Sequence, residues 1–236
     1  MKKDCLYIVM PAYNEEKNIA SVVEAWYPLL SRASEDSRLV VADSGSTDRT
    51  SEILKKLCET HPQLEILTKS GQQHGPKLMA LYHHAIESGA DLIFQTDSDG
   101  QTDPADFDAF WKRRRRYDAI LGYRPRRGDG PVRKFVERVL CFLLWLFFGV
   151  KLPDANAPYR LMRASLVKKY LERLPMDYNI PNVMFSVYFA HYHEKLRFLP
   201  VSFRARQGGK NSVDITKIVH IGWKALGEFY RLKKEM

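Results

Sequence analysis

The sequence has little cysteine and lacks an apolar run long enough to cross a bilayer. Its three cysteines, Cys5, Cys58 and Cys141, are odd in number and widely spaced, which excludes a disulfide framework and a four-ligand zinc site and favours a reducing compartment. Residues 139–150 are apolar apart from one glycine, but a membrane-spanning helix needs about 20 residues. We therefore expect no transmembrane span, and predict a core helix, a dimer contact or an interfacial helix at this segment.

Internal repeats and low-complexity tracts are also missing, and the composition is that of a folded protein. The chain has 236 residues, of which 45% are hydrophobic, enough for one large domain with a sizeable core. A disordered or fibrous chain is therefore excluded. The apolar stretch before Pro11 is short, so we expect the first strand of a cytosolic protein there rather than a secretory signal.

Charge is distributed unevenly along the chain. Residues 1–111 hold 10 basic and 18 acidic side chains, whereas residues 112–236 hold 27 basic and 10 acidic ones. The basic half could attract phosphate, nucleic acid or an anionic membrane, and the acidic half could hold a metal. The basic run 112–116 is most simply a solvated surface at the end of a helix, so by itself it does not predict a nucleic-acid site.

Short β-rich runs alternate with helical patterns in the first 122 residues, which predicts an α/β fold with a mainly parallel central sheet flanked by helices. The expected strands there are 6–10, 39–42, 64–68, 92–95 and 119–122, and the expected helices are 17–30, 49–58, 77–87 and 105–115. Later segments are expected to form a loop at 153–158, helices at 164–174, 183–193 and 216–234, and a strand at 196–203. Ligands of such sheets bind beyond the carboxyl ends of the strands, so the segments that follow the strands carry the candidate chemistry.

The fourth expected strand ends at Asp97-Ser98-Asp99-Gly100. Two carboxylates separated by one residue are hard oxygen donors that suit Mg²⁺ or Mn²⁺, and such ions complete their coordination with substrate phosphates and water. A nucleoside diphosphate is the natural partner of such a site. The alternative is that these residues form only a turn.

The first two expected strands also end in polar segments, Pro11-Ala12-Tyr13-Asn14-Glu15 and residues 43–48. Tyr13 could stack on a base, and Glu15 and Asp43 could accept hydrogen bonds from a base or a ribose. The alternative is that Asn14 and Asp48 cap helices and that the segment after Asp43 forms a turn.

Taken together, in this order and spacing, these segments resemble the family 2 glycosyltransferases, which have the GT-A fold, a nucleotide-binding α/β domain with an Asp-x-Asp metal site. Within that family the chain looks most similar to the branch of dolichol-phosphate mannose synthases and polyprenyl-phosphate glycosyltransferases. The residues that carry this likeness are Gln101, Gly122-Tyr123-Arg124, residues 154–160, residues 200–209 and Ser212. The resemblance implies a single domain over residues 1–236, with a nucleotide-sugar-binding part at 1–122 and an acceptor-binding part at 123–236 that includes the apolar helix near 135–150.

The resemblance also implies a role for each matching residue. The nucleoside would be bound by Pro11, Ala12, Tyr13, Glu15 and Asp43, and the metal and diphosphate by Asp97 and Asp99 with Gln101 beside them. The acceptor phosphate or the leaving diphosphate would be bound by Arg124, Arg133, Arg206 and Ser212, with Arg127 as an alternative to Arg133. The implied catalytic group is Asp99, Arg124, Arg133 and Asp154.

The implied reaction is an inverting transfer by direct displacement, with Mg²⁺ or Mn²⁺ as cofactor, a UDP- or GDP-linked sugar as donor and a polyprenyl phosphate as acceptor. A sugar hydroxyl needs a general base, whereas a lipid phosphate is already an anion. Members of this branch often carry an acidic residue before the segment matching Pro200, where this chain has Asn182-Val183-Met184-Phe185. This departure favours the phosphate acceptor, and Asp154 is the candidate base if the acceptor is a glycan hydroxyl.

Two other classes compete with this interpretation. A nucleotidyltransferase would normally have a basic, glycine-rich loop after the first strand, where this chain has Ala12-Tyr13-Asn14-Glu15. A basic nucleic-acid-binding module would bind without divalent metal and with strong salt dependence. We instead expect a cytoplasmic enzyme whose basic segment and adjoining apolar helix could bring it to the face of an anionic membrane, the alternative being a buried helix or a homodimer contact.

Overall fold

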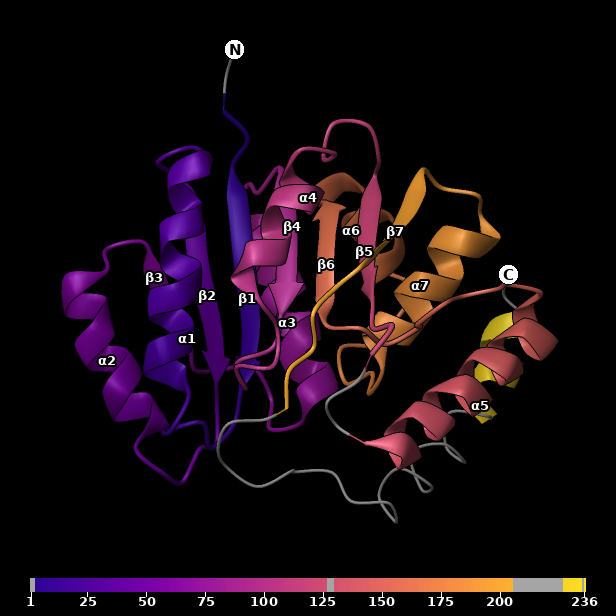
Figure 1. Cartoon of the computed structure of the whole chain (residues 1–236), viewed down its shortest axis with the longest axis horizontal. Helices are drawn as coiled ribbons and strands as arrows, with labels where there is room; N and C mark the ends of the chain where they lie inside the picture. The colour runs from indigo at the N-terminus through magenta and orange to yellow at the C-terminus, as the bar shows by residue number, and fades with distance from the viewer. Residues whose placement is uncertain (1–2, 127–129, 206–226, 235) are drawn as a thin grey trace.

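The computed structural model describes residues 3–126, 130–205, 227–234 and 236, and is built on a seven-stranded sheet (Figure 1). The strands lie in the order β3-β2-β1-β4-β6-β5-β7. Their bounds are β1 Leu6–Ala12, β2 Arg38–Asp43, β3 Leu64–Leu67, β4 Leu92–Thr96, β5 Ala119–Tyr123, β6 Tyr159–Arg163 and β7 Leu196–Pro200. Since only β6 pairs antiparallel to its neighbours, the other six strands end at one edge of the sheet.

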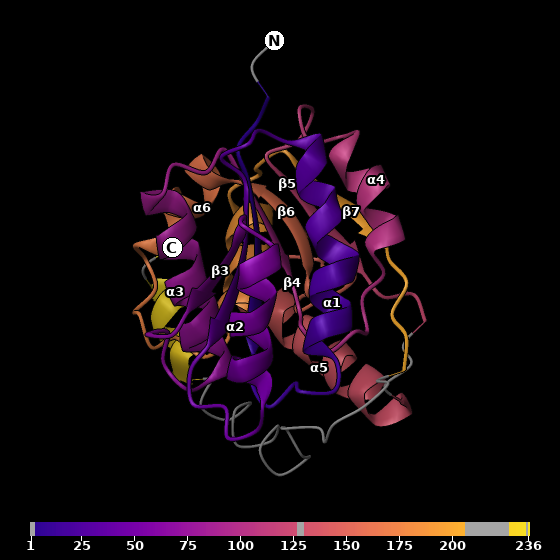
Figure 2. The same ribbon diagram turned by 90° about the vertical axis from the view of Figure 1, so that its left-hand side faces the viewer.

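Helices cover both faces of the sheet (Figures 1 and 2). One face is covered by α1 Ile19–Trp26, α2 Thr50–Thr60 and α4 Phe107–Trp111, and the other by α3 His74–Glu87, α6 Ala164–Leu171 and α7 Pro181–His191. Strand β1 shows why both faces are filled. Its alternate residues Leu6 and Ile8 pack with α1, while Tyr7 and Val9 pack with α3, because successive side chains of a strand point to opposite faces. The prediction of a mainly parallel sheet flanked by helices is confirmed.

The five strands expected in the first 122 residues are all present, but β6 was not predicted. Its sequence, Tyr-Arg-Leu-Met-Arg, lacks a continuous apolar run because an arginine, Arg160, stands at its second position. In the structure that position is fully buried. Sequence patterns treat an arginine as a surface residue, so the strand was missed. The expected strand at 196–203 ends earlier, at Pro200, and Phe203 forms only an isolated bridge with Thr102.

Helix ends differ from the expected ones for local reasons. The helix expected at 17–30 stops at Trp26 and continues as a 3₁₀ helix over Tyr27–Arg32. Pro28 lies in its first turn, and proline can neither donate an amide hydrogen bond nor fit against the carbonyl four residues earlier. A second short 3₁₀ helix, Pro104–Asp106, precedes α4. Of the expected helix 216–234, residues 227–234 are described and are helical.

Helix α5, Pro131–Phe148, begins before the apolar run that predicted it. It lies at the rim of the molecule and starts near the edge at which the parallel strands end (Figures 1 and 2). Its residues Leu144 and Phe148 are buried in the core, and the Phe148 ring lies 5.7 Å from that of Phe229. Among the described residues, no helix combines the length and the apolar character needed to cross a membrane.

Gly75 allows α3 to pack closely against the segment before α7. A β-carbon at this position would overlap the carbonyl oxygens of Tyr178 and Asn179, which belong to the backbone and cannot turn away. We expect Gly75→Ala to lower the free energy of unfolding by about 3 kcal/mol, measured by urea denaturation. Gly89→Ala is the control, because Gly89 has a φ of +81° but open space around it and should cost only about 1 kcal/mol. Equal losses in the two variants would contradict the close contact.

Candidate functional site

The edge at which the parallel strands end gathers the polar segments that the sequence singled out. The segments after β1, β2, β4 and β5 all lie there, since these strands share one direction. Because β6 runs the other way, the loop before it reaches the same edge and brings Asp154 with it. Tyr13, Asp43, Asp97, Arg124 and Asp154, which are far apart in the sequence, therefore lie along one rim.

Hydrogen bonds fasten the loop after β1 to the loop after β2. Asn14 adopts a left-handed conformation, with a φ of 53°, and its side-chain oxygen accepts a 2.8 Å hydrogen bond from the Thr47 amide. The Glu15 amide donates to the Thr50 hydroxyl at 2.8 Å. That hydroxyl in turn donates to Asp48. The two loops therefore behave as one unit. Asp48 also accepts a 3.0 Å hydrogen bond from the Thr50 amide at the start of α2, as the capping alternative predicted, whereas Asn14 bonds across to the other loop.

Two carboxylates beneath these loops are buried, whereas the neighbouring tyrosine is exposed. Asp43 is 3% exposed and accepts hydrogen bonds from the Ser46 and Ser51 hydroxyls. Glu15 is also buried and accepts a 2.8 Å hydrogen bond from the Asn18 amide group. The Tyr13 side chain, by contrast, is 44% exposed. An exposed aromatic ring can stack on a planar base, and carboxylates held in place by hydrogen bonds can accept bonds from its polar groups.

Lys77 on α3 belongs to this site and was missed by the sequence analysis. It is fully buried, its ammonium group donates to the Ala12 carbonyl oxygen, and its Nζ lies 5.3 Å from the centre of the Tyr13 ring. Burial lowers the pKa of Lys77, and the nearby charge of Asp43 opposes that shift. In the sequence this lysine is only the first residue of an expected helix. A lysine at such a position does not indicate a binding site.

Asp97 and Asp99 follow β4 and are both half-buried. Asp99 accepts a 3.1 Å hydrogen bond from the Gln101 amide, and Asp97 lies 3.4 Å from Nε2 of His74. Ser98 between them points inward and donates to the Pro11 carbonyl oxygen at 2.7 Å. This bond fixes the turn against the end of β1.

The donor set of this turn suits a hard divalent cation. It offers two carboxylates with access to solvent, and the remaining ligands of such an ion would come from phosphate oxygens and water. Among the described residues, no group of three or more histidine, cysteine or acidic side chains is close enough to hold a metal unaided. Asp97 and Asp99 therefore fit a cation that arrives with its phosphate ligand.

Gln101 ties this turn to the segment after β7. Its side-chain amide donates to the Arg204 carbonyl oxygen at 2.8 Å, and the Arg204 amide donates back to the Gln101 carbonyl oxygen at 2.8 Å. Gln101 is 4% exposed. It is therefore placed to fix the loop beside Asp99 rather than to offer its amide to solvent.

Arg124, directly after β5, forms a bidentate ion pair with Asp154. The Nε–Oδ2 distance is 2.7 Å and the Nη2–Oδ1 distance is 2.9 Å. The two side chains are 5% and 3% exposed, and Glu137 of α5 lies 3.7 Å from Arg124 Nη2. Asp154 also accepts hydrogen bonds from the amides of Arg124 and Asn156. A carboxylate bound in this way orients a cation more readily than it removes a proton from a substrate.

Arg160 holds the loop of Asp154 from below. Its guanidinium donates to the carbonyl oxygens of Ala155 at 2.7 Å and Ala157 at 3.0 Å, and the Ser186 hydroxyl donates to Ala155 as well. Complete burial lowers the pKa of Arg160 to about 10, a shift that nearby anionic groups oppose. The sequence analysis singled out this arginine only as part of a motif. Its structural role required knowledge of the burial.

Other predicted residues lie elsewhere or cannot be placed. Arg133 lies in the first turn of α5 and is partly exposed, whereas Arg127, Arg206 and Ser212 lie outside the described residues. The basic run 112–116 follows α4 and precedes β5, so it lies at the opposite edge of the sheet. Within it, Arg114 pairs with Asp4 at 2.7 Å.

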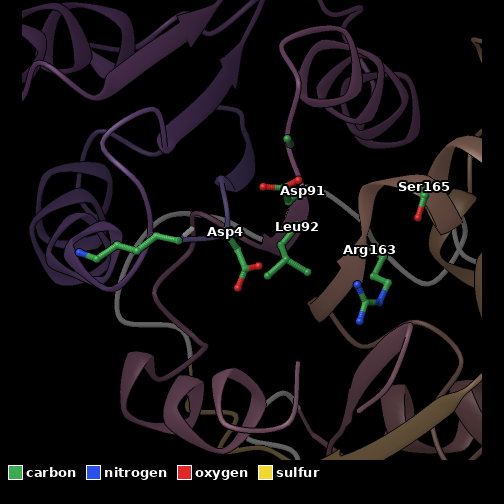
Figure 3. Close-up of a pocket in the computed structure, with 7 residues that line it drawn as sticks. Asp4, Asp91, Leu92, Arg163 and Ser165 are labelled. Carbon is green, nitrogen blue, oxygen red and sulfur yellow. The ribbon is translucent and has the colours of Figure 1, made fainter. Parts of the chain in front are cut away.

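A cavity of about 360 Å³ also lies at that opposite edge (Figure 3). It is lined by the charged residues Asp4, Asp91 and Arg163 together with Lys3, Ala90, Leu92 and Ser165. Arg163 already pairs with Asp118, and Asp91 accepts from the Cys5 amide. This cavity is therefore separate from the site at the carboxyl edge.

Comparison with known proteins points to one family. The profile of glycosyl transferase family 2 matches residues 7–171. An undecaprenyl-phosphate 4-deoxy-4-formamido-L-arabinose transferase of Edwardsiella ictaluri is 22% identical over 91% of this chain and 64% of its own length. A dodecaprenyl-phosphate galacturonate synthase of Rhizobium johnstonii is 25% identical over 92% of this chain and 64% of its own. The chain thus spans less than two thirds of these relatives.

Solved structures share the fold at lower identity. Glucosyl-3-phosphoglycerate synthase of Mycobacterium tuberculosis, in complex with Mn²⁺ and UDP-glucose, superposes with a TM-score of 0.68 at 18% identity and covers 94% of this chain and 77% of its own. Its UDP complex gives a TM-score of 0.67 at 17% identity, covering 96% and 80%. The fold is accordingly GT-A, as the sequence motifs predicted.

The hydrogen bonds of Asp48 predict a pH dependence of stability. Partial burial disfavours the charged form, but hydrogen bonds from Thr50 and the Glu16 amide outweigh it and lower the pKa of Asp48. This contribution is complete above the unfolded pKa of about 3.9 and is lost as the pH falls through the lower folded pKa. We expect Asp48→Asn to cost about 1 kcal/mol at neutral pH and progressively less below about pH 4, measured by urea denaturation. The control is Asp177→Asn, at an exposed position; a loss independent of pH would contradict the assignment.

The buried pair of Arg124 and Asp154 predicts non-additive losses of stability. Asp154→Asn keeps the shape but leaves the guanidinium with less compensating charge, so we expect the free energy of unfolding to fall by about 3 kcal/mol. Adding Arg124→Met to that variant should cost much less than Arg124→Met costs in the parent protein. Urea denaturation of the four proteins measures the coupling, and simple additivity would show that the two side chains do not interact.

Proposed function

Because the chain belongs to glycosyl transferase family 2, we propose that it is an inverting glycosyltransferase that moves a sugar from a nucleoside diphosphate to a polyprenyl phosphate. The observation that carries this proposal is the order of groups along the carboxyl edge. Tyr13 with Asp43 comes first, then Asp97 with Asp99, then Arg124 with Asp154. This order matches a nucleoside, its diphosphate and an anionic acceptor lying in one line.

The donor half of the proposal rests on the loops after β1, β2 and β4. Tyr13 would cover one face of the base, while Asp43 and Glu15 would accept its hydrogen bonds or those of the ribose. Lys77, held at the end of β1, adds a cation directly beneath this position. The related solved synthase was crystallised with UDP and with UDP-glucose, so we take a UDP-linked sugar as the first candidate donor.

Asp97 and Asp99 would hold Mg²⁺ or Mn²⁺ together with the diphosphate, as the Mn²⁺ complex of the related synthase supports. A divalent cation bound there would stabilise the charge that develops on the leaving nucleoside diphosphate. The two carboxylates would fix the position of that diphosphate relative to Tyr13. Gln101 and Ser98 keep the turn in place through their bonds to Arg204 and Pro11.

The acceptor half rests on Arg124, Asp154 and the residues around them. An oxygen of the acceptor phosphate would form a bond to C1 of the sugar as the bond from C1 to the diphosphate breaks, and the electron pair would leave with the nucleoside diphosphate. No proton is transferred in this step, so no base is required. The oxygens of Asp154 are bound by the Arg124 guanidinium and by two backbone amides. Asp154 would therefore orient the Arg124 guanidinium toward the acceptor phosphate. The named substrates of the relatives, undecaprenyl and dodecaprenyl phosphate, support this choice over a glycan hydroxyl.

The part of the chain up to residue 122 would thus bind the donor and the part after it the acceptor. Arg133 on α5 is close to the start of this acceptor part, and Arg127, Arg206 and Ser212 remain candidates from the sequence alone. Because a polyprenyl phosphate resides in a bilayer, the enzyme would work as a peripheral protein at a membrane surface. A homodimer is not needed for this arrangement.

Substitution of the two carboxylates tests the proposal. We expect Asp97→Asn and Asp99→Asn each to lower the rate of sugar transfer to a polyprenyl phosphate by at least about 100-fold, and to abolish the thermal stabilisation by UDP that depends on Mn²⁺. Asp36→Asn, on the exposed loop before β2, is the matched control. Full activity in both variants would refute the assignment.

Parallel assays identify the donor and the acceptor. UDP and GDP are compared with and without Mn²⁺ in the thermal assay, and polyprenyl phosphate is compared with a panel of oligosaccharides as acceptor. Transfer to an oligosaccharide alone would replace the proposed acceptor by a glycan hydroxyl.

A further inference from the structure

Helix α5 exposes an unusual amount of apolar surface. Of the eight large hydrophobic side chains exposed in the described part of the chain, five lie on this helix. They are Phe135 at 67%, Leu146 at 60%, Phe142 at 57%, Trp145 at 46% and Val139 at 41% exposure. Scattered apolar residues are normal on a protein surface, but a contiguous group of this kind marks an interaction site.

These side chains form one continuous face. Phe135, Val139, Phe142 and Leu146 recur with the helical period and therefore lie in one stripe. The buried residues Leu144 and Phe148 lie on the opposite side of the helix, where they pack into the core. Helix α5 is thus apolar on both sides, and only the inner side is covered by the described residues.

Basic side chains border the outward stripe. Lys134 and Arg138 are exposed, and the helical period places them with Trp145 along one margin of the stripe. The single acidic residue of the helix, Glu137, points inward, where it accepts a 2.8 Å hydrogen bond from the Ala155 amide. A second copy of this helix would offer the stripe further cations and no acid, whereas an anionic lipid surface offers the complementary charge.

We propose that the outward stripe of α5, formed by Phe135, Val139, Phe142 and Leu146, inserts into the surface of an anionic membrane while Lys134 and Arg138 contact the lipid phosphates. Aromatic and aliphatic side chains beside cations are the pattern of helices that lie in the membrane interface. Such a helix is bound along its length and does not cross the bilayer.

The inner side of the same helix contacts the proposed acceptor site. Glu137 bonds to the backbone next to Asp154 and lies 3.7 Å from Arg124 Nη2. Docking of α5 would therefore bring the Arg124–Asp154 pair to the depth of the lipid phosphates. This inference rests on the proposed function for its substrate, but the binding of membrane can be measured without any transfer reaction.

Flotation with vesicles tests the docking. The whole protein is mixed with vesicles of phosphatidylethanolamine and phosphatidylglycerol, and separately with vesicles of phosphatidylcholine. We expect binding to the anionic vesicles, and at least about tenfold weaker binding for each of Phe142→Glu and Leu146→Glu. Met176→Glu is the matched control because Met176 is equally exposed, at 54%, but lies outside α5. Lys134→Gln with Arg138→Gln should remove the preference for anionic vesicles.

Further measurements separate this inference from the proposed function. Thermal stability and UDP binding of the variants report folding, and transfer to a short-chain, water-soluble prenyl phosphate reports chemistry without a membrane. The inference requires that Phe142→Glu and Leu146→Glu retain thermal stability, UDP binding and transfer to the short acceptor. The same variants must lose transfer to an acceptor embedded in vesicles. Transfer to the short acceptor by a parent protein that binds no vesicles would overturn the docking alone, whereas vesicle binding without any transfer would overturn the function alone. If the parent protein binds no vesicles but sediments as a dimer, and Phe142→Glu dissociates that dimer, the stripe is instead the contact with a second copy of the chain.

Discussion

The buried ion pair of Arg124 and Asp154 is the interaction on which the proposed acceptor side of the molecule depends. A guanidinium with 5% of its surface exposed must be neutralised by a nearby acid, and Asp154 and Glu137 both approach it. These three residues come from the end of β5, the loop before β6 and the inner side of α5. This electrostatic contact therefore links three segments whose apolar residues also share one hydrophobic core.

The donor side is organised mainly by hydrogen bonds between loops, several of which involve a charged side chain. The loop after β1 is fixed to the loop after β2 through Asn14, Thr47 and Thr50, and Lys77 fixes the end of β1 to α3. Since these bonds are made within the chain, the loops are positioned before any nucleotide arrives. Less conformational entropy remains to be lost on binding.

Much of the fold could be predicted because it depends on patterns that the sequence displays locally. Alternating β-rich and helical runs identified β1 to β5, and the carboxylates after β4 marked the edge at which a ligand would bind. Strand β6 escaped because its pattern contains Arg160, a charged residue whose burial depends on carbonyl groups of its own preceding loop. Lys77 was not identified because its hydrogen-bond partner, the Ala12 carbonyl oxygen, lies 65 residues earlier in the chain. The buried cations required the tertiary structure, whereas the candidate metal ligands did not.

The direction and pairing of β6 have a consequence for how the chain must assemble. In the observed pairing Gln95 lies opposite Arg160, and the guanidinium is directed to the side of Ser186 on α7. A shift of this strand by one residue would send Leu161 to that side and Arg160 into the aromatic layer around Trp26 and Phe94, since neighbouring strand residues alternate between faces. In the shifted register the Arg160 charge would be buried among aromatic rings without acceptors. The hydrogen bonds from Arg160 to the loop that carries Asp154 would also be lost. The burial of Arg160 among hydrogen-bond acceptors therefore favours the observed register over one shifted by a single residue.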